Sequence, residues 1–191
     1  TTRATALALQ DGIYIKSGDT TRRYLGTIYI TSAGGVTEDS ATKRYVWNYY
    51  NREHRALRRL ETTDSWTYSA RTYRQANNNT LNQVNVVVGV AETMVYLFLG
   101  QLVRQSGATG VATIGIGYDN KTTFTTGPIA TTGLVAVANA FAYISTSMTA
   151  YPAIGQHYYA WLEGGDGGGT NTWFSSDGNT RSHGLMGFMN A

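Results

Sequence analysis

The chain has 191 residues, a formal net charge of +3 and no cysteine. That length suits one domain with a sizeable core, and the lack of cysteine excludes disulfides and thiolate metal sites. Charged residues make up only 14%, against about 25% in an average soluble domain. With 22 glycines and 14 tyrosines, this composition favours β-strands whose outer faces carry hydroxyl groups instead of charges.

The organisation of the chain is expected to be simple. We interpret residues 1–10 as a linker or a remnant strand from a preceding region, and 11–191 as a single β-sandwich domain. The numbering starts at Thr1 without a methionine or a signal segment, so it may begin inside a longer polypeptide. The apolar run 86–103 is interrupted by Glu92 and glycines, so we expect no membrane insertion.

Short apolar and aromatic segments separated by glycine-rich or asparagine-rich turns predict many strands and no strong helix. The first two, 12–16 and 23–31, have the right lengths to form a hairpin with each other. In chain order the predicted strands are residues 12–16, 23–31, 43–51, 54–61, a pair within 64–75, 82–91, 93–104, 111–118, 122–126, 134–142, 143–149, 154–163, 171–175 and 184–189. This pattern predicts an all-β fold, an antiparallel, jelly-roll-like β-sandwich.

The segment 43–61 also fits an amphipathic helix, since several apolar residues lie at helical spacing. The β-favouring residues 45–50 and the turn residue Asn51 favour two strands instead. As a strand, the segment places Tyr45, Trp47 and Tyr49 on one face. These three are predicted aromatics of a core or a subunit interface.

The arginines around this aromatic run raise nucleic-acid binding as an alternative. Arginine accounts for 12 of the 15 basic residues, and many of them lie in 43–74. The net charge is modest and no known nucleic-acid-binding motif is present, so we expect solvated or carboxylate-paired arginines and no nucleic-acid partner.

Catalytic motifs are absent: there is no nucleophile elbow, no phosphate-binding loop and no zinc-protease helix. The histidines His54, His157 and His183 are too far apart in sequence for a metal pair, so we expect no catalytic, metal or cofactor site and no enzyme activity. Paired carboxylates for glycoside hydrolysis could come from Glu38, Asp39, Glu53, Glu61, Asp64, Glu92, Glu163 or Asp166. Among these Glu92 stands out, and we expect it at a strand end with its carboxylate in solvent or on an arginine.

A second group of aromatic residues lies late in the chain, beside glycine-rich loops. Trp161, Trp173 and Tyr158 are candidate contacts for a glycan or a partner, since ring faces with nearby hydroxyls and amides suit sugars. The competing interpretation is that the same rings fill the core or a subunit interface.

Two segments resemble a recurrent C-terminal module of bacteriophage virion proteins. They lie at residues 11–27 and 37–52, and weaker similarity is found at 66–68, 74–77 and 155–163. The module is found on tail fibres, tailspikes and head fibre or decoration proteins. The resemblance implies a β-rich virion structural protein at the surface of the phage particle, often a homotrimer, whose partners are its own copies and other virion proteins.

The resemblance brings no catalytic residues. We therefore expect a virion appendage module that could also contact the host surface. The alternative is a carbohydrate-binding module that recognises a host receptor, and a glycan-degrading enzyme comes third.

Overall fold

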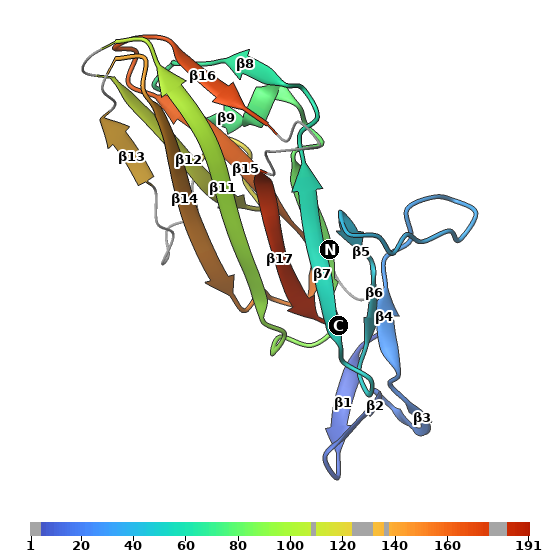
Figure 1. The fold of residues 1–191 in the computed structure, drawn as a ribbon. Helices are drawn as coiled ribbons and strands as arrows, with labels where there is room; N and C mark the ends of the chain where they lie inside the picture. Colours follow the sequence, from blue (N-terminus) through green and yellow to red (C-terminus); the bar gives the residue numbers. More distant parts are fainter. Residues whose placement is uncertain (1–4, 108–109, 124–131, 136–137, 176–182) are drawn as a thin grey trace.

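The computed structural model describes residues 5–107, 110–123, 132–135, 138–175 and 183–191. Within these ranges the chain forms strands and one short 3₁₀ turn, Ala76–Asn78, with no α-helix. The predicted all-β, jelly-roll-like antiparallel sandwich is confirmed (Figure 1). The same part of the chain has no helix of the length and hydropathy needed to cross a membrane.

The first layer, sheet I, has the strand order β13-β12-β15-β10-β5, with β9 paired beside β15. Its pairs are antiparallel except β10 with β5, which is parallel. Its strands are β5 (Lys43–Arg44), β9 (Arg74–Gln75), β10 (Gln83–Val88), β12 (Val111–Tyr118), β13 (Thr132–Val135) and β15 (Gly155–Gly165).

The second layer, sheet II, has the order β7-β17-β11-β16-β8, and β14 pairs with the other edge of β11. All its pairs are antiparallel. Its strands are β7 (His54–Leu60), β8 (Ser65–Thr67), β11 (Val95–Gln105), β14 (Phe141–Ala150), β16 (Asn171–Phe174) and β17 (Gly184–Asn190).

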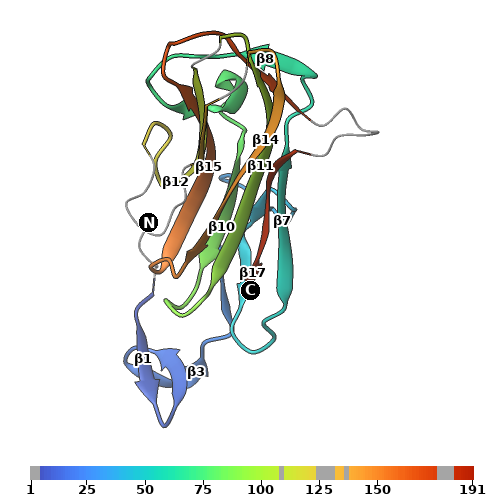
Figure 2. The same cartoon turned by 60° about the vertical axis from the view of Figure 1, so that its left-hand side comes forward.

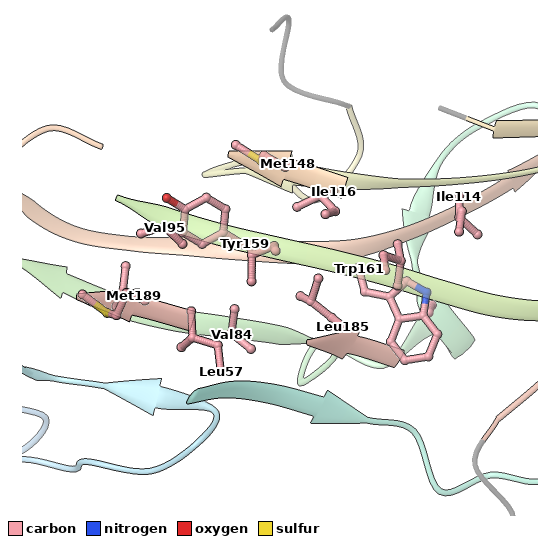
Figure 3. Close-up of a cluster of buried hydrophobic side chains, with 14 of the residues drawn as sticks. Leu57, Val84, Val95, Ile114, Ile116, Met148, Tyr159, Trp161, Leu185 and Met189 are labelled. Carbon is pink, nitrogen blue, oxygen red and sulfur yellow. The ribbon is translucent and has the colours of Figure 1, made fainter. Parts of the chain in front are cut away.

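The core lies between the two sheets and is built from alternate residues of each strand, as the period of two in a β-strand requires. On β11, Val95, Leu97 and Leu99 have no exposed surface. They face the inner side chains of sheet I, including Val84 and Ile116 (Figure 3).

Apart from β5, which belongs to sheet I, residues 5–50 form a small arm beside the sandwich. The strands β1 (Leu7–Gln10), β2 (Ile13–Lys16) and β3 (Asp19–Arg23) make one small sheet, and β4 (Gly26–Ile28) pairs with β6 (Val46–Asn48) in another. Figures 1 and 2 both show β1 and β3 projecting from one end of the sandwich. Residues 7–10, expected to be a linker or a remnant strand, form β1 and pair with β2.

The predicted hairpin between 12–16 and 23–31 is wrong. β2 turns back on β3 across Ser17 and Gly18, and Lys16 lies opposite Asp19. Gly18 has a φ of 79°, which suits a two-residue hairpin turn. β3 was not predicted because it is polar and almost fully exposed, so it lacks the alternation of apolar residues that indicates a strand. The 23–31 segment supplies β4, whose partner is β6.

Three other predicted elements also differ. The two strands within 64–75 are real, but β8 joins sheet II and β9 joins sheet I, so they do not pair with each other. The predicted boundary between 134–142 and 143–149 is misplaced, since β14 runs unbroken from Phe141 to Ala150. The 122–126 strand falls largely outside the described residues. The two-strand interpretation of 43–61 is confirmed, with a break at Tyr45.

Candidate functional site

Two of the late aromatic residues are part of the core. Trp161 and Trp173 have no exposed surface, and Trp161 points inward from β15 (Figure 3). The indole N–H of Trp173 donates to the Tyr68 carbonyl at 2.9 Å. Tyr158 points to the other face of β15, where it is half-buried beneath the Lys121 ammonium. The three rings therefore do not form one platform for a sugar.

The aromatic run at 45–49 forms a wall between the arm and the sandwich. Trp47 is 1% exposed, stacks on Tyr24 with ring centroids 6.1 Å apart, and donates its indole N–H to Thr93 Oγ1 at 2.9 Å. Tyr49 is half-buried beside both rings. Tyr45 is also buried, but its ring packs against Tyr29 instead. The wall thus fixes the arm to the turn that joins β10 to β11.

The arginines around this wall pair with groups of the chain itself. Arg52 reaches Glu92 at 2.8 Å and lies over the Trp47 ring. Arg44 and Arg55 both reach Asp39, at 3.3 and 3.7 Å. Glu92 lies on the turn between two strands with its carboxylate on an arginine, which confirms the expectation for that residue.

The strongest concentration of buried polar groups is an acidic network that the sequence did not reveal. Glu61 is 3% exposed, and its carboxylate accepts hydrogen bonds from the backbone N–H of Thr62 and Thr63. Its other oxygen accepts from the side-chain amides of Asn79 and Asn82, at 3.0 and 2.8 Å. Burial alone would raise the pKa of Glu61, but these donors outweigh it and lower the pKa to about 2.

Glu163 is the second member of this network and has no exposed surface. It accepts from the indole N–H of Trp66, from Arg74 Nε at 2.9 Å and from the backbone N–H of Asn77 at 3.1 Å. Burial raises the pKa of Glu163 to about 7, against the opposing effect of these donors. The Asn77 side chain donates to Thr63 Oγ1, which connects the two carboxylates through one turn.

This network holds structure together and does not resemble a hydrolytic pair. Both carboxylates are enclosed, and nearly every acceptor position is filled by donors of the chain itself. Glu92 and Glu163, two of the acids considered for glycoside hydrolysis, do not converge either. Val88 pairs with Gly155, and Glu163 lies eight residues further along β15, roughly 25 Å away. Glycoside hydrolysis needs carboxyl groups within about 10 Å of each other.

The histidines occupy three separate places. His157 Nδ1 lies 2.7 Å from Asp119, and its Nε2 lies 2.8 Å from the Ala153 carbonyl. His183 is buried beside the Tyr143 ring, and His54 lies against Phe188. Across the described ranges, no three His, Cys, Asp or Glu side chains come together in a way that could hold a metal ion.

A groove of about 680 Å³ lies between the arm and the end of sheet I. Segment 22–30 forms one wall, and Val87, Val88 and residues 154–156 form the other. The lining is mainly apolar and carries three cations, Lys16, Arg22 and Arg23, of which Arg22 pairs with Asp19. The described residues that line the groove include no carboxylate, so they supply no acid–base pair for catalysis.

The comparisons with known proteins add no relative to this picture. No family model matches the chain, and no curated protein matches it significantly.

Proposed function

We propose that the chain is a structural module of a bacteriophage virion appendage: part of a tail fibre, a tailspike or a head fibre or decoration protein at the particle surface. It acts as a homo-oligomer and contacts other virion proteins. Its phage identity rests on the sequence resemblance at 11–27 and 37–52, and the structure supports the structural half of the proposal.

The observation that carries the structural role is the burial of the aromatic residues. Trp47, Trp161 and Trp173 are at most 1% exposed, and each packs within the fold. A structural module uses its rings in this way, whereas a receptor binder of the type considered needs two or more exposed rings in one groove. The acidic network also fits a structural role, since its carboxylates are buried and hold neighbouring turns in place.

The test of the proposal is whether the chain is part of the particle. Particles of the phage that encodes the chain are purified on a density gradient, analysed by mass spectrometry, and labelled with an antibody raised against the folded chain. We expect the chain in intact particles, with label on an appendage or on the head surface. Its absence from purified particles, while other virion proteins are present, would contradict the proposal.

The carbohydrate-binding alternative has a separate test. An array of host surface glycans is probed with the wild-type chain and with Tyr158→Ala, since Tyr158 is the accessible ring of the three candidates. The structural role predicts no glycan binding. Binding that Tyr158→Ala abolishes would favour receptor recognition instead.

A further inference from the structure

The outer face of sheet II carries apolar side chains over β11, β17 and one end of β14, beside the hydroxyl residues Ser145, Ser147 and Thr149 of β14. No strand in the described part of the chain packs on this face. On β11, alternate residues point outward, and those positions are occupied by Tyr96, Phe98, Leu102 and Arg104. A sandwich sheet that faces water normally carries polar side chains at such positions. This face is turned toward the viewer in Figure 1, where β14, β11 and β17 lie side by side with no labelled strand in front of them.

The outward residues of the neighbouring strands extend the same surface. Phe188 lies against Tyr96, with ring centroids 5.5 Å apart, and Phe141 lies against Phe174 at 5.2 Å. Phe141 and Tyr143 are 58% and 52% exposed, which is unusual for two aromatic residues of one strand. We call this surface the apolar face; it consists of Tyr96, Phe98, Leu102, Phe141, Tyr143, Phe174, Met186 and Phe188.

Sheet I shows that this is not a general property of the sandwich. The outward positions of its strand β12 include Thr113, Gly115 and Gly117. On β15 they include Gln156 and Tyr158. Other outward positions of sheet I are Ala160 and Leu162, which have no exposed surface, so this face is partly covered within the fold. Large aromatic rings at outward positions are concentrated on sheet II.

The size of the apolar face matches a stable interface. β11 has 11 residues, so it is roughly 37 Å long, and four adjacent strands are roughly 19 Å wide. The sheet therefore offers a footprint of about 700 Å², close to the roughly 800 Å² that each partner contributes to a standard interface.

The charges on this face do not specify a foreign partner. The charged or titratable side chains at outward positions of β7 and β11 are His54, Arg58 and Arg104, and Arg104 already lies near the Phe141 and Phe174 rings. They lie at the margin, so the centre is uncharged and holds apolar residues of β11 and β17 beside hydroxyl residues of β14. Depletion of charged residues at the centre is typical of protein interfaces. A flat apolar sheet face is also complementary to itself, as a two-fold interface requires.

We propose that the apolar face of sheet II packs against the same face of a second copy of this chain. The inference deepens the proposed homo-oligomeric role by naming its surface, and it depends on that role only for its biological setting. The contact joins two sheets face to face and buries the two most exposed aromatic residues of β14.

The first test measures molecular mass by size-exclusion chromatography with light scattering. The variant Phe98→Lys places a charge at the centre of the face, opposite Met186 and Ser147. Its matched control is Thr113→Lys, at an outward, half-buried position on a central strand of sheet I. We expect a dimer, twice the 20.8 kDa of the chain, for the wild type and Thr113→Lys, and a monomer for folded Phe98→Lys. A monomeric wild type, or an oligomer that Phe98→Lys leaves intact, would overturn the inference.

The second test does not depend on how Phe98→Lys folds. The chain lacks cysteine, so the exposed Ser147→Cys and the sheet I control Thr113→Cys each carry a single thiol. Alkylation of Ser147→Cys should be several-fold slower at high protein concentration than on dilution, whereas the rate for Thr113→Cys should not change with concentration. A rate for Ser147→Cys that is independent of concentration would overturn the inference.

Salt distinguishes a second copy from an oppositely charged partner. Because the charged side chains described at the margin, Arg58 and Arg104, are both cations, two copies repel weakly there, and added salt should preserve or strengthen their association. An oligomer that dissociates as salt rises would be held by opposite charges and would contradict the inference. The mass and thiol assays use the isolated chain, so they test the contact between copies independently of the phage particle. The chain can be found in the virion even if these assays contradict the contact, and the contact can be present even if the chain is absent from the virion.

Discussion

Glu61 offers the sharpest test of the energetic reasoning, because its carboxylate accepts five hydrogen bonds inside the fold. The variant Glu61→Gln keeps the shape of the side chain but removes the charge. One end of the new amide must be an NH₂ group. If it occupies the Oε2 position, it faces the amide donors of Asn79 and Asn82, which then have no acceptor there.

The magnitude follows from two estimates. Leaving two buried donors without an acceptor costs about 1 to 3 kcal/mol each. The pKa of Glu61 falls from its ordinary value of 4.5 to about 2, which corresponds to about 3 kcal/mol of stability from the ionised form. We therefore expect Glu61→Gln to lose about 3 to 5 kcal/mol at pH 7, a large part of a typical unfolding free energy of about 5 to 15 kcal/mol.

The pH dependence makes the prediction specific. Since the pKa is lower in the folded state, the stabilisation is complete well above pH 4.5 and disappears as the pH falls toward 2. The stability gap between wild type and Glu61→Gln should therefore narrow by about 2 kcal/mol between pH 7 and pH 3. Other titrating groups, Glu163 included, are common to both proteins and cancel from this difference.

Urea unfolding followed by tryptophan fluorescence at pH 7 and pH 3, at one protein concentration, measures the gap. Glu53→Gln, at an exposed position, is the matched control and should stay within about 0.5 kcal/mol of the wild type at both pH values. A gap that is the same at pH 7 and pH 3 would refute the reasoning, as would a Glu61→Gln protein as stable as the wild type.

Three further predictions concern the wall, the core and the second carboxylate. Gly89→Ala should destabilise the fold by about 1 to 3 kcal/mol in urea unfolding, since a Cβ there would overlap the Trp47 ring and the Tyr24 hydroxyl. Its control is Gly34→Ala, where a Cβ would make no close contact, and this variant should be neutral. Trp173→Ala should cost about 3 to 5 kcal/mol, whereas Tyr158→Ala should cost far less; equal losses would contradict the difference in their burial. Burial raises the pKa of Glu163 to about 7, so the folded protein should become less stable as this carboxyl ionises. Between pH 5 and pH 8 the unfolding free energy of the wild type should fall by about 2 to 3 kcal/mol relative to that of Glu163→Gln. Parallel stability curves for the two proteins over that range would argue against this prediction.

The sequence predicted the sandwich well because the strands of its core carry a strong pattern. The runs around Val86 and Leu97 predicted central strands, and the structure has β10 and β11 there, one in each sheet. The arm was predicted less well. β3 is polar and exposed, so no apolar pattern marks it as a strand. β4 pairs with a strand 20 residues further on, so its partner is not its nearest neighbour in the sequence.

The acidic network was missed for a different reason. Glu61 lies at the end of a strand, and the Asn77–Asn79 turn looked like a polar loop tip. Nothing in a single sequence shows that these groups meet. Asn77 and Asn78 have positive φ values of 54° and 51°, and the turn brings the Asn77 amide groups between the two carboxylates. The density of asparagine and threonine near Glu61 was the one available signal, and it equally fits a solvated loop.

The two faces of β11 show how far periodicity alone can lead. Its sequence from Val95 to Val103 is apolar at nearly every position, which predicts a strand covered on both sides. The structure encloses the side that carries Leu97 and Leu99 and leaves Tyr96 and Phe98 partly exposed on the outer side of sheet II. In the proposed contact, burial against a second copy would supply the cover that the sequence pattern predicts for this second side.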